Sequence, residues 1–315
     1  MKVGTGEAPG KALLIGEHAV VYDQPAIAIP VRSVKARVQV RFSRNEGFDL
    51  IAPDLDEHVR AGEKPTKRLA PLLKLAEHVM TSFGENGQGL EIEIRSSIPS
   101  ARGMGSGAAV SVALVRALCD MLGRSLHAEQ ICQMAGLAEK EYHGNPSGVD
   151  AAVVARDEPI YFVKSRGVRP IEIGPGTFHF VVADTGVDAA TAEIVDDVRR
   201  GREQDRANFD SYFWEIGSLA SVSREVLHSG SPAELGLCMN RAHAALRAIG
   251  VSCRELDKLV GVALENGAFG AKLSGAGRGG AMIALVDGED EAERVGRELL
   301  GAGAEDIFTT VLGAS

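Results

Sequence analysis

The sequence has few cysteines and no excess of basic charge. Four cysteines occur among 315 residues, and none is in Cys-x-x-Cys spacing. This favours buried, reduced thiols, as in the cytosol, over disulfides. The net charge is −9 and no lysine or arginine run is present, which argues against a nucleic-acid-binding protein. We therefore expect a cytoplasmic protein without a nucleic-acid partner.

Long hydrophobic segments are also missing. No apolar run reaches the roughly 18 residues that a membrane-spanning helix needs, and residues 1–7 lack the apolar region of a signal peptide. We therefore expect neither secretion nor membrane insertion. Because 45% of the 315 residues are hydrophobic, the chain can bury one large core or two cores of ordinary size.

Two familiar phosphate-binding motifs are absent or out of context. Residues 9–12 come closest to a P-loop, but they lack the first glycine and the hydroxyl after Lys11. Residues 103–108 fit Gly-x-Gly-x-x-Gly/Ala, yet the next helix leads to another helix instead of a strand that ends in an acid. A second match at 275–280 runs into a strand. Neither a P-loop nor a dinucleotide-binding fold is predicted.

The sequence does contain a strand, a glycine-rich loop and an apolar helix in succession. Alternation over 90–95 predicts a half-buried strand, and the small and apolar residues of 108–122 predict a buried helix. The glycines between them allow positive φ and let a ligand approach the backbone N–H groups. A helix start adds unpaired N–H groups and a positive dipole end. The loop is therefore predicted to bind phosphate.

The remaining periodicities predict a mixture of helices and strands. In the first half we expect strands at 26–29 and 34–41 in an antiparallel meander, and helices at 65–83 and 127–142. In the second half we expect strands at 178–184 and 307–311, a hairpin of 271–273 with 281–286, and helices at 191–206, 209–228, 235–249 and 289–300. This pattern fits an α+β fold.

Several polar residues have two interpretations on spacing alone. Lys11 opens a strand that ends before Glu17 and His18, which is typical either of a polar substrate site or of a solvated strand end. Asp150 precedes an apolar run and is either a helix cap or a catalytic carboxylate. Glu139 by itself is typical of a helix surface.

Three separated stretches, in this order, resemble the motifs of the GHMP kinase superfamily. They are residues 9–11 with 16–22, residues 99–109 and residues 272–280. Glu139 followed by residues 143–150, and Gly-Glu-His-Ala-Val-Val at 16–21, resemble more narrowly the mevalonate kinases. The resemblance implies a two-lobed α+β fold. The N-terminal lobe (1–170) would be like ribosomal protein S5 domain 2, and the C-terminal lobe (171–315) would be ferredoxin-like.

The resemblance also implies a reaction, the transfer of the γ-phosphoryl group of ATP to the 5-hydroxyl of mevalonate. Asp150 would lie at that hydroxyl, and Lys11 would lie near both it and the γ-phosphate. An aspartate is too weak a base to remove the proton in advance, so Asp150 would orient the hydroxyl and take the proton late. Substrate contacts are implied for Glu17, His18 and Thr185. Phosphate contacts are implied for Arg102, Gly103, Met104, Gly105, Ser106, Gly107 and Ala108.

The metal site is where the sequence departs from the family pattern. The family's loop usually has two serines, the second of which binds Mg²⁺ together with a helix glutamate. Here Gly107 replaces the second serine, while Ser106 and Glu139 keep the matching positions. We expect a water or Ser106 to take the missing place. Arg102 and Arg278 are extra cations near the glycine loops, and we hypothesise that one contacts a phosphate.

Two alternatives stay open. One is another GHMP kinase, acting on phosphomevalonate, homoserine or a sugar. The other is a non-catalytic member that binds a nucleotide through the same fold, against which the retention of Lys11, Glu139 and Asp150 argues. Since family members are commonly dimers, the resemblance implies a homodimer.

Overall fold

The computed structural model describes residues 2–44, 46–143 and 147–313, and the chain forms two compact units. The first unit comprises Met1–Gly10, Val34–Pro99 and Gly105–Asp157, and the second comprises Lys11–Ser33, Ser100–Met104 and Glu158–Ser315. Strands β1 (Gly4–Ile15) and β2 (Ala26–Ser43), which pair with each other, therefore contribute residues to both units. Among the described residues, every helix is too short or too polar to span a membrane.

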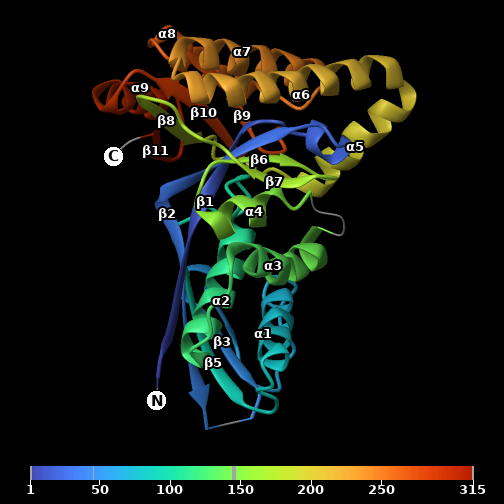
Figure 1. The fold of residues 1–315 in the computed structure, drawn as a ribbon, viewed down its shortest axis with the longest axis vertical. Helices are drawn as coiled ribbons and strands as arrows, with labels where there is room; N and C mark the ends of the chain where they lie inside the picture. The colour runs from blue at the N-terminus through green and yellow to red at the C-terminus, as the bar shows by residue number, and fades with distance from the viewer. Residues whose placement is uncertain (1, 45, 144–146, 314–315) are drawn as a thin grey trace. The chain divides into compact units, whose positions relative to one another are not determined.

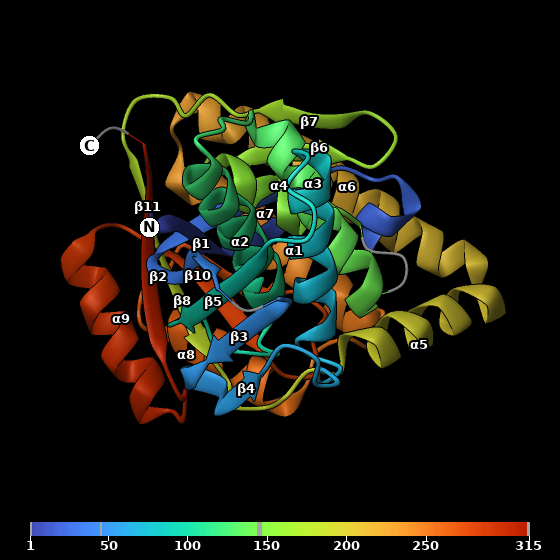
Figure 2. The same ribbon diagram turned by 90° about the horizontal axis from the view of Figure 1, so that it is seen from below.

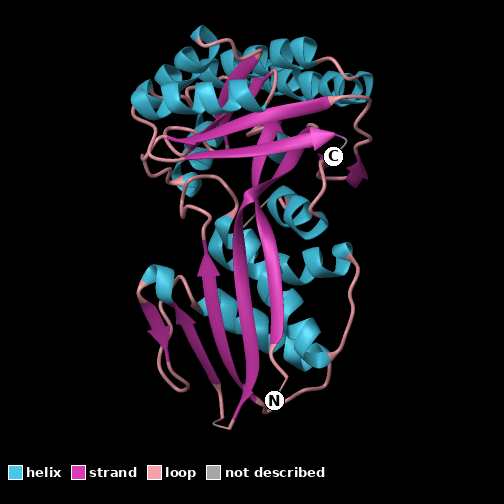
Figure 3. Cartoon of the chain, turned by 90° about the vertical axis from the view of Figure 1, so that its left-hand side faces the viewer, coloured by secondary structure: helices cyan, strands magenta, loops and turns pink. Residues whose placement is uncertain are grey.

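The first unit packs helices against a sheet (Figure 3). Its part of β2 pairs antiparallel with β5 (Gly89–Ser96), which runs parallel to β3 (Phe48–Ala52), and β3 pairs with β4 (Glu57–Val59) after the short η2 (Pro53–Leu55). Helices α1 (Ala70–Ser82), α2 (Ser106–Leu122), α3 (Ala128–His143) and α4 (Val149–Arg156) cluster together (Figure 2). Helix α2 is buried along most of its length, as its small and apolar residues predict.

The second unit contains a four-stranded antiparallel sheet in the order β11-β8-β10-β9. These strands are β8 (Thr177–Asp184), β9 (Gly270–Ser274), β10 (Ala281–Val286) and β11 (Ile307–Gly313). Helices α7 (Pro232–Ala248), α8 (Arg254–Glu265) and α9 (Glu289–Gly301) pack against it. Helix α6 (Arg206–Ser229) lies beside α7 and follows α5 (Thr191–Gln204) (Figure 1). The remaining elements are η1 (Ala19–Tyr22), β6 (Ile160–Val163) and β7 (Gly167–Pro170).

The α+β class and most predicted elements are confirmed, with two corrections. The strand that Lys11 was expected to open begins at Gly4, so Lys11 lies inside β1. The strands expected at 26–29 and 34–41 form a single strand, β2, which continues through Pro30. Residues 26–28 pair with β6 and residues 36–43 pair with β5, so the proline lies between the two ladders. Its missing N–H therefore removes no bond from either ladder. The domain boundary at residue 170 stays a prediction.

Candidate functional site

Lys11, Glu17 and His18 lie in the second unit, on β1 and the turn that follows it. All three side chains are buried, and the Lys11 amide donates to the carbonyl of Met104 at 3.0 Å. Gly16 opens the turn with a φ of 126°, and a Cβ at that position would lie 2.3 Å from the Cβ of Ala26. Only glycine fits at position 16, and β1 therefore ends just before Glu17 and His18.

Glu17 forms a fully buried ion pair with Lys272 of β9. Both side chains have 0% exposure, and the Lys272 ammonium donates to Oε1 of Glu17. Burial lowers the pKa of Lys272, the Glu17 carboxylate opposes that shift, and the charge of Lys11 adds to it. Oε2 of Glu17 is also buried and has no hydrogen-bond partner among the described residues.

His18 is held by the glycine-rich loop that follows β9. Its Nε2 donates to the carbonyl of Ala276 at 2.9 Å. Burial lowers the pKa of His18 to about 4, and the charge of Arg278 acts in the same direction. The imidazole is therefore neutral near pH 7, and with Nε2 as the donor its Nδ1 is an acceptor.

Thr185 and Ser274 fix the two ends of that loop. The Thr185 hydroxyl donates to the carbonyl of Gly280 at 2.7 Å. The Ser274 hydroxyl accepts from the amide of Leu13 at 2.9 Å and donates to its carbonyl at 3.1 Å. Because its proton is used within the protein, Thr185 has only a lone pair left for a ligand.

Arg102 is surrounded by carboxylates. Its guanidinium lies 3.1 Å from Asp184, 2.9 Å from Asp188 and 3.2 Å from Glu305, and the side chain is 15% exposed. The Arg102 carbonyl lies so close to Gly280 that a Cβ on that glycine, at φ 69°, would approach it to 2.9 Å. Arg102 therefore connects residues 100–104 to β8 and to the loop after β9. A phosphate contact of Arg102 stays a prediction.

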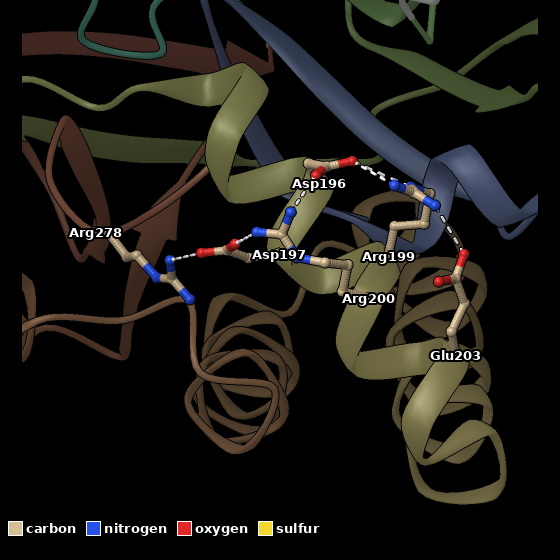
Figure 4. A network of polar contacts seen from close by, with 6 residues as sticks. All are labelled: Asp196, Asp197, Arg199, Arg200, Glu203 and Arg278. Carbon is tan, nitrogen blue, oxygen red and sulfur yellow. Dashed lines mark hydrogen bonds and ion pairs between the residues drawn. The ribbon is translucent and has the colours of Figure 1, made fainter.

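Arg278 belongs to a chain of ion pairs along helix α5 (Figure 4). Its guanidinium lies 2.5 Å from Asp197, which also pairs with Arg200, and it donates to the carbonyl of Gly250 at 3.2 Å. The hydrogen bonds from both arginines lower the pKa of Asp197. The loop after β9 is thus connected to α5, and a phosphate contact of Arg278 also stays a prediction.

The other predicted residues lie in the first unit, at or near helix starts. Gly105, at φ 74°, is the N-cap of α2, and Gly148, at φ 84°, is the N-cap of α4. Among the described residues, no side chain caps either helix, so backbone N–H groups remain for another acceptor. Ser106, Gly107 and Ala108 form the first turn of α2, and Asp150 lies in the first turn of α4. Glu139 is 5% exposed on α3.

Comparison with known proteins assigns the chain to a family. Residues 71–157 match the family model described as GHMP kinases N terminal domain, and residues 223–305 match GHMP kinases C terminal. A mevalonate kinase from Aeropyrum pernix is 34% identical over 98% of this chain and 95% of its own length. A mevalonate kinase from Thermococcus gammatolerans is 32% identical over 96% of this chain and 95% of its own length. The chain belongs to the mevalonate kinase family of the GHMP kinases.

Solved structures agree with this membership. The mevalonate kinase of L. major, crystallised in complex with R-mevalonate, is 29% identical with a TM-score of 0.84 and covers 99% of this chain and 96% of its own. The Methanococcus jannaschii mevalonate kinase is 25% identical with a TM-score of 0.83 and covers 98% of each chain. A Streptococcus pneumoniae phosphomevalonate kinase, at 17% identity, shares the fold alone. The protein is therefore a kinase.

Membership in this kinase family implies a divalent metal ion. Within the described ranges, no three His, Cys, Asp or Glu side chains gather to hold one. Helices α2 and α3 pack together in the first unit, and Ser106 and Glu139 supply oxygen donors from them. A donor set this small fits a hard cation that takes its other ligands from phosphates and water.

The structure thus distributes the predicted residues over both units. It places Lys11, Glu17, His18, Arg102, Gly103, Met104 and Thr185 in the second unit, and Gly105, Ser106, Gly107, Ala108, Glu139 and Asp150 in the first. In the motif at 143–150, residues 144–146 lie outside the described residues. The ion pair of Lys272 was not predicted from the sequence. A lysine between the apolar Ala271 and Leu273 is the signal that could have revealed it, since a buried ammonium needs a carboxylate.

Proposed function

We propose that this protein transfers the γ-phosphoryl group of ATP to the 5-hydroxyl of mevalonate and releases 5-phosphomevalonate and ADP. The observation that supports it is the 32–34% identity to curated mevalonate kinases over nearly the whole chain. The L. major relative was crystallised with R-mevalonate. A galactokinase resembles the chain at only 20% identity, so a sugar substrate is not favoured.

Asp150 and Lys11 are the proposed catalytic residues. Phosphoryl transfer passes through a loose transition state, so positioning and neutralisation of charge provide most of the catalysis. Asp150 orients the 5-hydroxyl and takes its proton as the new P–O bond forms. Lys11 stabilises the negative charge on the transferring group.

The other predicted residues bind the two substrates. The loop Gly103–Ala108, with Arg102 before it, surrounds the triphosphate, which suits the uncapped start of α2. Glu17, His18 and Thr185 hold the polar end of mevalonate. His18 is neutral near pH 7, so it adds no positive charge to these contacts.

We propose Mg²⁺ as the divalent ion, held by Glu139 and Ser106. When bound, it would neutralise charge on the phosphate oxygens of ATP. Gly107, in the first turn of α2, supplies no side-chain ligand, so a water or Ser106 would take the place of the family's second serine. We also propose a cytoplasmic homodimer, with a domain boundary at residue 170 of the chain.

The decisive experiment measures ADP release with Mg-ATP and four separate acceptors: mevalonate, phosphomevalonate, homoserine and galactose. Activity on mevalonate alone, lost in Asp150→Asn, is the expected result. Activity on another alcohol would keep the mechanism and change the substrate. No activity on any acceptor would favour a non-catalytic nucleotide-binding protein.

A further inference from the structure

Lys272 is a buried charge that the proposed reaction does not use. It lies within β9 opposite Ile283 of β10, and its side chain has no exposure. Its neighbours Ala271 and Leu273 are apolar and buried. An apolar side chain would fill this place without the cost of desolvating an ammonium, because buried ion pairs are often no more stabilising than apolar packing. Stability alone therefore does not explain why a charged side chain occupies this buried position.

Lys272 engages only one of the two carboxylate oxygens of Glu17. Its Nζ donates to Oε1 and to the carbonyl of Leu273. Oε2 is buried and has no hydrogen-bond partner within the described part of the chain. Such acceptors are uncommon, because they give up hydration without replacing it. Lys272 thus fixes the carboxylate with one oxygen left for a donor that comes from outside the protein.

The charges around the pair favour a hydroxyl as that donor. The titratable groups nearby are Lys11 of β1, His243 of α7 and, next to His243, Arg247 and Asp257. His243 accepts from the amide of Leu273 at 3.4 Å, and burial lowers its pKa to about 4, so it is neutral near pH 7. No second carboxylate touches Glu17 among these contacts. A ligand carboxylate would be repelled by Oε2, whereas a hydroxyl would donate to it.

Mevalonate has one carboxylate, a tertiary hydroxyl at C3 and a primary hydroxyl at C5. The carboxylate is unsuited to Glu17, and the proposed function assigns the C5 hydroxyl to Asp150. The C3 hydroxyl is the group that remains. We propose that Lys272 is a positioning residue that holds Glu17 by one oxygen, so that the other accepts a hydrogen bond from the C3 hydroxyl of mevalonate. This inference rests on the proposed function.

The test combines a protein variant with a substrate analogue. Lys272→Met keeps the length of the side chain and removes its charge. We expect the KM for mevalonate to rise roughly 10- to 100-fold, the size of one hydrogen bond to a charged group, while kcat and the KM for ATP change less than about threefold. The analogue 5-hydroxy-3-methylpentanoate lacks the C3 hydroxyl. The wild type should discriminate against it by a similar factor, and Lys272→Met should discriminate by less than about threefold.

Two further variants separate positioning from folding. The double variant Glu17→Gln, Lys272→Met leaves no unpaired buried charge, so it tests the proposal even where Lys272→Met alone fails to fold. It should show the same loss of discrimination. Lys258→Met, an exposed lysine on α8, is the matched control and should behave as the wild type.

The outcomes distinguish this inference from the proposed function. A wild type that is inactive on mevalonate overturns the proposed function before Lys272 is tested. An active wild type whose Lys272→Met variant keeps full discrimination against the analogue overturns the inference. The same holds where the variants lose thermal stability alone, because the ion pair would then serve folding and not substrate binding.

Discussion

Asp150 lies in the first turn of α4, after a glycine N-cap, and its proposed role depends on its charge. Asp150→Asn preserves the shape and removes the proton acceptor. We expect kcat to fall about 10²- to 10⁴-fold, the usual contribution of a general base, and the dissociation constant for ATP to stay within about threefold. ADP release and calorimetric titration with ATP measure the two quantities. A kcat within tenfold of the wild type would remove Asp150 from the mechanism.

Gly107 is the residue that separates this chain from the usual family loop. It is exposed within the first turn of α2, where a serine can adopt the helical backbone. If a water replaces the missing ligand, Gly107→Ser should lower the Mg²⁺ concentration for half-maximal activity by up to roughly tenfold, or about 1.4 kcal/mol. Activity measured against Mg²⁺ at saturating ATP tests this. Gly261→Ser, on α8 with open space around it, is the control. An unchanged Mg²⁺ requirement would show that residue 107 does not contribute to the metal site.

At the scale of elements, the contact of β1 with α2 depends on Gly6. A Cβ there would lie 2.1 Å from the carbonyl of Ala113. Gly6→Ala should therefore lower the free energy of unfolding by about 1–3 kcal/mol, since backbone atoms must move apart. The matched control, Gly136→Ala, lies on α3 with nothing within 4 Å and should stabilise by up to about 1 kcal/mol. Urea denaturation of both variants provides the comparison, and equal effects would contradict close packing at Gly6.

The local patterns predict elements better than they predict pairing. The alternation of β5 and the small residues of α2 are properties of short windows, so both were predictable. The unbroken course of β2 was not predictable. Pro30 lies between the part of β2 that pairs with β6 and the part that pairs with β5, and no window of sequence contains these partners. Helix α8 was missed as well, although its apolar residues have helical spacing.

At the scale of the whole molecule, the same limit applies to the candidate site. Lys11, Glu17 and His18 are close in sequence, and their order resembles a family motif, so they could be predicted. The partner of Glu17 lies 255 residues away, and the carboxylates around Arg102 come from β8, the loop after it and the segment before β11. Such contacts are created by the fold, and spacing along the chain does not encode them.

The stability of the molecule should depend on two buried histidines. Burial lowers the pKa of His18 and of His243 from 6.5 to about 4. Because the unfolded chain binds these protons first, their contribution to stability is complete above pH 6.5 and is lost as the pH falls toward 4. The loss amounts to at most about 3 kcal/mol for each histidine.

Urea denaturation between pH 7.5 and pH 5 isolates this effect. The carboxylates whose pKa is lowered below 3.8, among them Asp23 and Asp120, lose their contribution only at lower pH. We expect the wild type to become progressively less stable as the pH falls across this range, and the double variant His18→Gln, His243→Gln to be less stable at pH 7.5 with a flatter dependence. Equal slopes in the two proteins would mean that the unfolding free energy is linked to protonation at other groups, and that these imidazoles remain buried for packing alone.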